Sequence, residues 1–258
     1  MNVAQIAVTE SERSRPRSSV PEQRADAFIF VGMLLFIWAG LLFGFVPRIY
    51  QHIVQHRPPY LAVVHLHTFL FLGWMVLFTT QVVLVRSKNL LLHRRLGKLS
   101  FFWGPTMVVI GTVTQFMVSQ ARFGTPRWDP PFVAIPLADL VNFGILLAFA
   151  LRMRRYGATH KRLMLLATSA ISNVGFARWW GAGLANWLGE GFLSEMAQDY
   201  LGGFLVIVGL IVYDVAVRGR PSRPVLIGGA FIVGVEALAI YLYFNPWWLE
   251  LTTQVLHP

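Results

Sequence analysis

Long apolar stretches separated by short polar segments dominate the chain. Seven of these stretches can cross about 30 Å of hydrocarbon, which takes about 20 residues of helix. They lie near 27–47, 60–85, 98–121, 132–151, 162–183, 200–217 and 225–244. Each is apolar on every helical face, and only helices satisfy their own backbone polar groups economically in lipid. The pattern predicts an all-α protein, a polytopic membrane helix bundle with seven transmembrane helices.

Charge alternates between successive loops and predicts an orientation. Lysine and arginine concentrate in three loops, at Arg86, Lys88, Arg94, Arg95 and Lys98, at Arg152, Arg154, Arg155, Lys161 and Arg162, and at Arg218, Arg220 and Arg223. The positive-inside rule places these loops, and with them the N-terminus, in the cytoplasm, and the C-terminus outside. We therefore expect a multi-pass protein of a bacterial-type cytoplasmic (inner) membrane.

Composition supports the lipid bilayer as the solvent of this chain. Hydrophobic residues make up 55% of it, charged residues only 13%, and the mean hydropathy is +0.56. The net charge of +10 then serves topology and attracts anionic lipid head groups, so we expect no nucleic acid partner. The absence of cysteine excludes disulfides, thiolate metal sites and cysteine nucleophiles.

Three regions follow from the pattern. Residues 1–26 are polar, rich in Ser, Arg, Glu and Pro, and predict a disordered cytoplasmic tail. Residues 27–244 form the seven-helix transmembrane domain, and 245–258 are expected to be a short outer C-terminal tail. We find no phosphate-binding loop, nucleotide fingerprint, serine-hydrolase elbow or zinc-protease motif.

A weak internal repeat places a histidine at the cytoplasmic start of two helices. His93-Arg94-Arg95-Leu96 opens the third predicted span, and His160-Lys161-Arg162-Leu163 opens the fifth. One interpretation is that these are ordinary positive-inside anchors at the level of the lipid head groups. The other is that the two imidazoles ligate one haem iron from both faces, with Arg94 and Arg162 pairing its propionates. The second interpretation requires the third and fifth spans to be neighbours.

The segment Leu92-His93-Arg94-Arg95-Leu96-Gly97-Lys98-Leu99 resembles the His-Arg-x-x-Gly segment of cytochrome b561-like and ferric-reductase-like transmembrane proteins and of related bacterial membrane families. The resemblance implies that His93 ligates haem b. Where ferric reductases carry a second histidine on the same helix, this chain has Met107, which can also ligate iron. The fourth span contains no histidine, so the resemblance supports one haem at most.

A second group of polar residues lies within the predicted spans, toward their outer halves. Its members are His65, His67, Asp139, Asn142, Asn173, Arg178 and Glu236. Ionisable groups in lipid are costly, so they face the bundle interior and pair with one another. They form either a polar core that orders the helices, with Arg178 offsetting one carboxylate, or a pocket for a polar ligand, a quinone head group, a proton relay or a metal.

The spacing of the two histidines in this group limits a metal site. Residues two apart on a helix point in nearly opposite directions, so His65 and His67 do not share one ion on a regular helix. We expect His67 to face inward, because Trp74 and Gln81 follow at intervals of seven residues. Gln81 then lies toward the cytoplasmic end, within reach of His93.

Two functions from different classes remain open. The first is an integral membrane redox protein, a membrane oxidoreductase if it is an enzyme, with one haem b near the cytoplasmic face and a quinone or similar electron partner. The second is haem-free. It is either an accessory subunit that works with other subunits of a membrane complex, or an integral membrane enzyme or transporter that uses the outer pocket.

Overall fold

The computed structural model describes residues 20–257, with side chains described from residue 28 onward. Within this range the chain is all-helical and has no strand. In chain order the helices are α2 (Val20–Val54), α3 (Ala62–Arg86), α4 (Leu90–Gly97), α5 (Ser100–Ala121), the short 3₁₀ helix η1 (Pro130–Val133), α6 (Ala134–Arg152), α7 (Gly157–Ala170), α8 (Asn173–Leu188), α9 (Phe192–Arg218), α10 (Arg223–Tyr243) and α11 (Pro246–Leu256). The predicted all-α class is confirmed.

Six helical segments of the described chain are long and apolar enough to cross a membrane. They are Phe28–Val54, Ala62–Arg86, Ser100–Ala121, Pro130–Arg152, Phe192–Arg218 and Arg223–Tyr243. Each corresponds to one of the predicted spans. Six apolar helices of this length indicate a multi-pass membrane protein.

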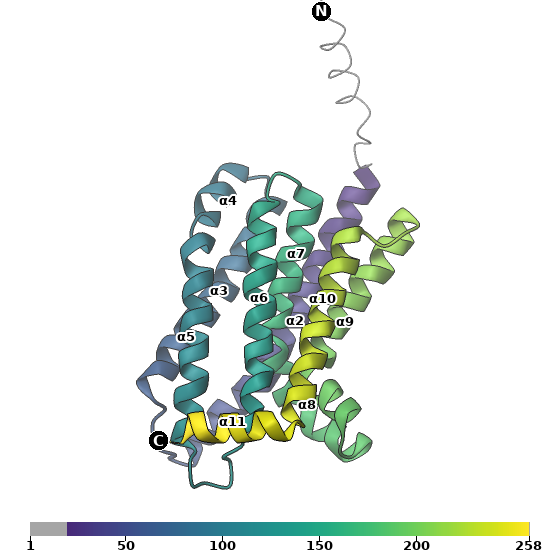
Figure 1. The fold of residues 1–258 in the computed structure, drawn as a ribbon. Coiled ribbons are helices and arrows are strands. Elements are labelled where there is room, and N and C mark those ends of the chain that lie inside the picture. Colours follow the sequence, from purple (N-terminus) through teal and green to yellow (C-terminus); the bar gives the residue numbers. More distant parts are fainter. Residues whose placement is uncertain (1–19, 258) are drawn as a thin grey trace, which may run out of the picture.

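The predicted span 162–183 is not one helix. It is divided between α7 and α8, with Ile171 and Ser172 between them, and α8 continues from the end of α7 away from α4 (Figure 1). Ser169 and Ser172 donate their side-chain hydroxyls to the carbonyls of Leu166 and Thr168, at 2.9 and 2.7 Å. Such bonds to the preceding turn compete with the regular helix ladder and bend helices.

Two short helices mark the opposite ends of the bundle. Figure 1 shows α4 at one end, where α2 also begins, and α11 lying across the other end, where the described chain stops. The start and the stop at opposite ends are consistent with an odd number of crossings. We refer below to the α4 end and the α11 end.

The two predicted tails differ from expectation in one respect each. The 1–26 tail lies outside the described residues up to residue 19, but α2 is helical from Val20, so the helix begins before the predicted first span, 27–47. The segment 245–258, predicted to be a short tail, contains α11. Asn245 caps this helix by accepting a hydrogen bond from the Trp247 N–H at 2.9 Å, and Trp248 donates to the Pro131 carbonyl at 3.1 Å.

Glycines allow α8 to lie directly against α2. A Cβ on Gly175 would come within 2.8 Å of the Gly40 carbonyl oxygen, and a Cβ on Gly44 would collide with the Gly175 carbonyl. Gly40 and Gly44 form a G-x-x-x-G pattern, which permits close backbone approach between membrane helices. On the other side of α8, Gly202 of α9 meets the Phe176 ring in the same way. This tight packing fixes the residues at the α7/α8 break.

Candidate functional site

His93 on α4 and His160 on α7 lie side by side at the α4 end. Their ring centroids are 6.5 Å apart, and the ring planes make an angle of 79°. Both side chains are partly buried. His93 belongs to a separate short helix that precedes the third span, not to the span itself as predicted. The fold nevertheless brings together the two histidines that the sequence repeat singled out.

A protein group holds the Nδ1 atom of each imidazole. The His160 Nδ1 lies 2.8 Å from the Ala150 carbonyl, which can only accept, so Nδ1 carries the proton and Nε2 a lone pair. The Gln81 amide lies 2.5 Å from the His93 Nδ1. The amide orientation that suits all its neighbours donates to this nitrogen and to the His93 carbonyl, and accepts from the Gly97 N–H. Gln81 therefore contacts His93, as the sequence predicted.

The surroundings of His93 favour its neutral form. Burial, the neighbouring His160 and the Arg94 charge all lower the pKa of His93 below its usual value, while the contact with Gln81 acts in the opposite direction. A neutral imidazole is the form that binds metal ions. With Gln81 donating to Nδ1, however, the proton of neutral His93 lies on Nε2, so neither ring nitrogen is free to bind a metal ion until the Gln81 amide rotates.

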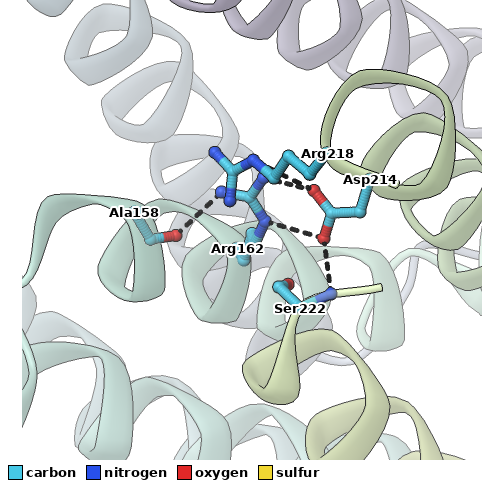
Figure 2. Close-up of polar contacts among 5 residues, drawn as sticks. All are labelled: Ala158, Arg162, Asp214, Arg218 and Ser222. Atoms are coloured by element: carbon cyan, nitrogen blue, oxygen red, sulfur yellow. Dashed lines mark hydrogen bonds and ion pairs between the residues drawn. The ribbon is translucent and has the colours of Figure 1, made fainter. Parts of the chain in front are cut away.

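Arg162 does not project toward the histidines as a partner for propionates, which corrects the sequence prediction. It is fully buried and binds Asp214 of α9 through two contacts, Nε to Oδ2 at 3.2 Å and Nη2 to Oδ1 at 2.5 Å. Its Nη1 donates to the Ala158 carbonyl at 3.1 Å, and the Ser222 backbone N–H donates to Asp214 at 3.1 Å (Figure 2). Arg218 approaches Asp214 only to 4.0 Å. The network ties α7, α9 and the start of α10 together.

The other two residues proposed near a haem occupy different environments. Met107 is fully buried in the apolar core, in one cluster with Trp74 and Phe143. Its side chain packs in that core cluster and is not placed beside the two histidines. Arg94 is exposed at the end of α4, where its guanidinium is accessible to anionic groups.

Asp139, Asn173 and Glu236 meet at the α7/α8 break. The Asn173 side-chain amide donates to Asp139 Oδ1 at 3.1 Å and to Glu236 Oε1 at 3.0 Å, and its oxygen accepts from the Gly203 N–H at 2.9 Å. Glu236 is fully buried and Asp139 is 7% exposed. We refer to Asp139 and Glu236, with the Asn173 amide between them, as the bridged carboxyl pair. It joins α6, α8, α9 and α10.

Asn142 lies one helical turn beyond Asp139 and is also fully buried. Neither its amide nitrogen nor its amide oxygen has a hydrogen-bond partner among the described residues, and the same holds for Glu236 Oε2. Buried polar atoms without partners are rare and call for a cause. One region thus contains four of the predicted pocket residues, namely Asp139, Asn142, Asn173 and Glu236.

Arg178 is not part of this region, contrary to the expectation that it offsets one carboxylate. Its Nη1 donates to the Val174 carbonyl at 2.9 Å, and its guanidinium lies over the Phe45 ring, 4.8 Å from the centroid. Among the described residues no ion pair joins Arg178 to Asp139 or Glu236. Its electrostatic partners include Asp199 of α9 and the cations Arg48 and Arg122.

The two other histidines of the predicted site, His65 and His67, lie in different environments, as their spacing requires. His65 is exposed, while His67 is partly buried and stacks on Phe71 with centroids 4.0 Å apart. The His67 Nδ1 is buried without a hydrogen-bond partner among the described side chains. In the described range, no group of three or more His, Asp or Glu side chains is placed to hold a metal ion. The polar pocket of the prediction thus splits into the bridged carboxyl pair and a separate Arg178 and His67 region.

Sequence reasoning missed the partners that hold these groups in place. The Arg162–Asp214 pair has no local signal, because its members lie on different helices, whereas helix spacing alone favours Arg218, four residues after Asp214. The G-x-x-x-G pattern of Gly40 and Gly44 was a readable signal. Comparison of the chain with protein-family models, with curated proteins and with solved structures finds no match.

Proposed function

We propose that this protein is an integral membrane redox protein that binds one b-type haem between His93 and His160. The observation that carries the proposal is the 6.5 Å separation of the two ring centroids. Two metal–nitrogen bonds of about 2 Å, together with the two ring radii, span about 6 Å, so the spacing of the rings is close to that of two imidazoles on one iron. The resemblance of the segment around His93 to b561-like proteins agrees with this assignment.

The group at His160 is what a haem ligand needs, whereas the group at His93 would first have to rotate. The Ala150 carbonyl fixes the His160 tautomer with Nε2 free, and a rotation of the Gln81 amide would present its oxygen to His93 Nδ1 and free the His93 Nε2. The exposed Arg94 is available to pair a propionate, whereas Arg162 is committed to Asp214. Bound haem would supply one-electron transfer, with a quinone or similar molecule as partner.

The proposed orientation puts this site at the cytoplasmic face. The three arginine- and lysine-rich loops connect helices at the α4 end, and the positive-inside rule assigns that end to the cytoplasm of a bacterial-type inner membrane. In this arrangement α7 and α8 together form the fifth of seven crossings. The basic α4 end then faces anionic lipid head groups.

The test is an absorbance spectrum of the detergent-purified protein, oxidised and then reduced with dithionite, with a pyridine haemochrome assay and iron analysis on the same sample. We expect a sharp reduced α-band and about one iron per chain. His93→Ala and His160→Ala should each abolish the low-spin spectrum. His65→Ala, on an exposed histidine, and His67→Ala should retain it.

A colourless, metal-free protein expressed with ample haem supply would contradict the proposal. Equal loss of the spectrum in all four variants would show unfolding, so each variant is also checked for a single peak in size-exclusion chromatography. Gln81→Leu sharpens the assignment, because it removes the group at His93 Nδ1 while keeping both ligands. We expect it to shift the midpoint potential without loss of haem.

One observation favours a second candidate, a haem-free transporter or membrane enzyme. The break between α7 and α8 lies beside the bridged carboxyl pair, and interrupted helices with nearby carboxylates form the ion sites of many transporters. An accessory subunit of a membrane complex would need neither this pair nor a haem. A colourless protein whose bridged carboxyl pair exchanges an ion would favour the transporter.

A further inference from the structure

Among the described residues, no cation pairs with the bridged carboxyl pair. Asp139 and Glu236 come from different helices, and each has the Asn173 amide as its hydrogen-bond partner. No ion pair reaches either carboxyl group in the described part of the chain. Two ionised carboxylates joined by one neutral amide would place two negative charges in a medium of low dielectric constant, which is strongly unfavourable.

Some buried polar atoms near the pair are accounted for if one carboxyl group carries a proton. In the described part of the chain, Glu236 Oε2 has no donor, and the Asn142 amide has neither a donor nor an acceptor, although both residues are fully buried. Asn142 lies three residues after Asp139 and so on the same face of α6. A protonated carboxyl group needs an acceptor for its O–H, and an unpartnered amide oxygen is one.

The backbone around the pair can balance one negative charge. Helix α8 begins at Asn173, so the partial positive charge of its N-terminus lies beside the two carboxyl groups. This end of the helix dipole amounts to about half a unit charge, enough to favour one carboxylate but not two. We propose that Asp139 and Glu236 together hold one exchangeable proton inside the bundle, independently of whether the protein binds haem.

The proton reaches the pair from the α11 end. Asp139 keeps 7% of its surface exposed, whereas Glu236 has none, so exchange begins at Asp139. Asp199 of α9 interacts electrostatically with Asp139, and Glu195, one turn earlier on the same face of α9, interacts with Asp199. Series of carboxyl groups of this kind carry protons in membrane proteins.

Other titratable groups near the pair do not replace this route. The Tyr200 hydroxyl, which is also in electrostatic range, is fully buried and donates to the Ile135 carbonyl at 3.2 Å. Arg178 of α8 interacts with Asp199 and not directly with the pair. Uptake at Asp139 converts a carboxylate into a carboxylic acid with no redox step, and its release restores the carboxylate.

The test is infrared spectroscopy of the detergent-purified protein in H₂O and in D₂O, from mildly acidic to alkaline pH. We expect the C=O stretching band of a protonated carboxylic acid to persist to neutral pH and to shift in D₂O. Glu236→Gln and Asp139→Asn should each remove or shift this band. The matched control is Glu250→Gln, since Glu250 is an exposed glutamate of α11, and its band pattern should equal that of the unmodified protein.

Two results would overturn the proposal. The first is the absence of a carboxylic-acid band in the unmodified protein at every pH, a result that does not depend on whether the variants fold. The second is a band that stays unchanged in both folded variants. The route is tested by the rate at which the band shifts after transfer into D₂O, which Asp199→Asn should slow at least several-fold; an unchanged rate would exclude Asp199. None of these infrared measurements requires haem, so they test the proposal equally well if the protein binds no haem.

Discussion

Two buried carboxyl sites in this bundle are compensated in opposite ways. At the α4 end, the Asp214 carboxylate receives two bonds from Arg162, one from the Ser222 N–H and a weaker approach from Arg218. At the α7/α8 break, two carboxyl groups share the single neutral amide of Asn173. Both sites join helices that are distant in the sequence. They differ in whether a cation is present.

The difference separates a structural role from a chemical one. A carboxylate bound by a bidentate arginine stays ionised, because protonation would weaken the ion pair. Such a pair is suited to holding helices together. A carboxyl pair without a cation has to hold a proton to be buried, and a proton held in this way can be exchanged. The predictions below test this contrast, beginning with the largest expected effect.

Removing the cation from the Asp214 site should cost the most. Arg162→Met leaves the Asp214 carboxylate buried without its main partner, and we expect a loss of about 3–5 kcal/mol in the free energy of unfolding. Thermal unfolding in detergent measures it. Arg162→Met combined with Asp214→Leu should recover most of the loss, because no unpaired charge remains. As control, Arg218→Gln should change stability by less than about 1 kcal/mol, since Arg218 lies 4.0 Å away and is 24% exposed.

Removing the shared amide should have the next largest effect. Asn173→Leu deprives Asp139, Glu236 and the Gly203 N–H of their common partner, which we expect to cost about 2–3 kcal/mol. The comparison is Asn142→Leu, which removes only the acceptor inferred for the carboxyl proton and should cost about 1 kcal/mol. Similar losses in the two variants would show that the bridge contributes nothing particular.

The sequence predicted the helices well and the partners poorly, for a physical reason. Span length and loop charge are local properties, so six spans and the all-helical fold follow from a window of about 20 residues. The His93 and His160 repeat was also legible, because both histidines open basic segments. The choice of Arg162 over Arg218 for Asp214 depends on how α7 and α9 pack. The break at Ile171 and Ser172 lies where Asn173 bridges residues of other helices, which no window in one helix reveals.

Neutralising a carboxyl group should have opposite signs at the two sites. Glu236→Gln keeps an oxygen for the Asn173 amide and removes one of the two carboxyl groups that share a proton, so stability at neutral pH should be unchanged or rise by up to about 1 kcal/mol. Asp214→Asn removes charge from a paired carboxylate and should lose about 1.5–3 kcal/mol. The measurement is the unfolding temperature of both variants at one pH. Equal losses at the two sites would remove the distinction drawn here.

Asp129, in the loop before η1, is an intermediate case with the smallest expected effect. The Tyr243 hydroxyl donates to its Oδ2 at 3.2 Å, and Arg122 lies in electrostatic range. Partial burial raises the pKa of Asp129 above its usual value, while Tyr243 and Arg122 oppose this change. The folded state therefore binds the proton more readily than the unfolded state. The stabilisation from protonation is fully present below a pH of about 3.8, the ordinary pKa of Asp, and is lost as the pH rises through the pKa of the folded state.

Asp129→Asn should consequently remove a small cost at neutral pH. The asparagine oxygen still accepts from Tyr243, and because the side chain is largely exposed, the gain in stability should stay within about 0.5 kcal/mol. Unfolding temperatures of both proteins between mildly acidic and neutral pH measure it, and the difference should grow as the pH rises. A difference that shrinks with rising pH would mean that Arg122 compensates Asp129 as Arg162 compensates Asp214, and that a cation in electrostatic range is sufficient without direct contact.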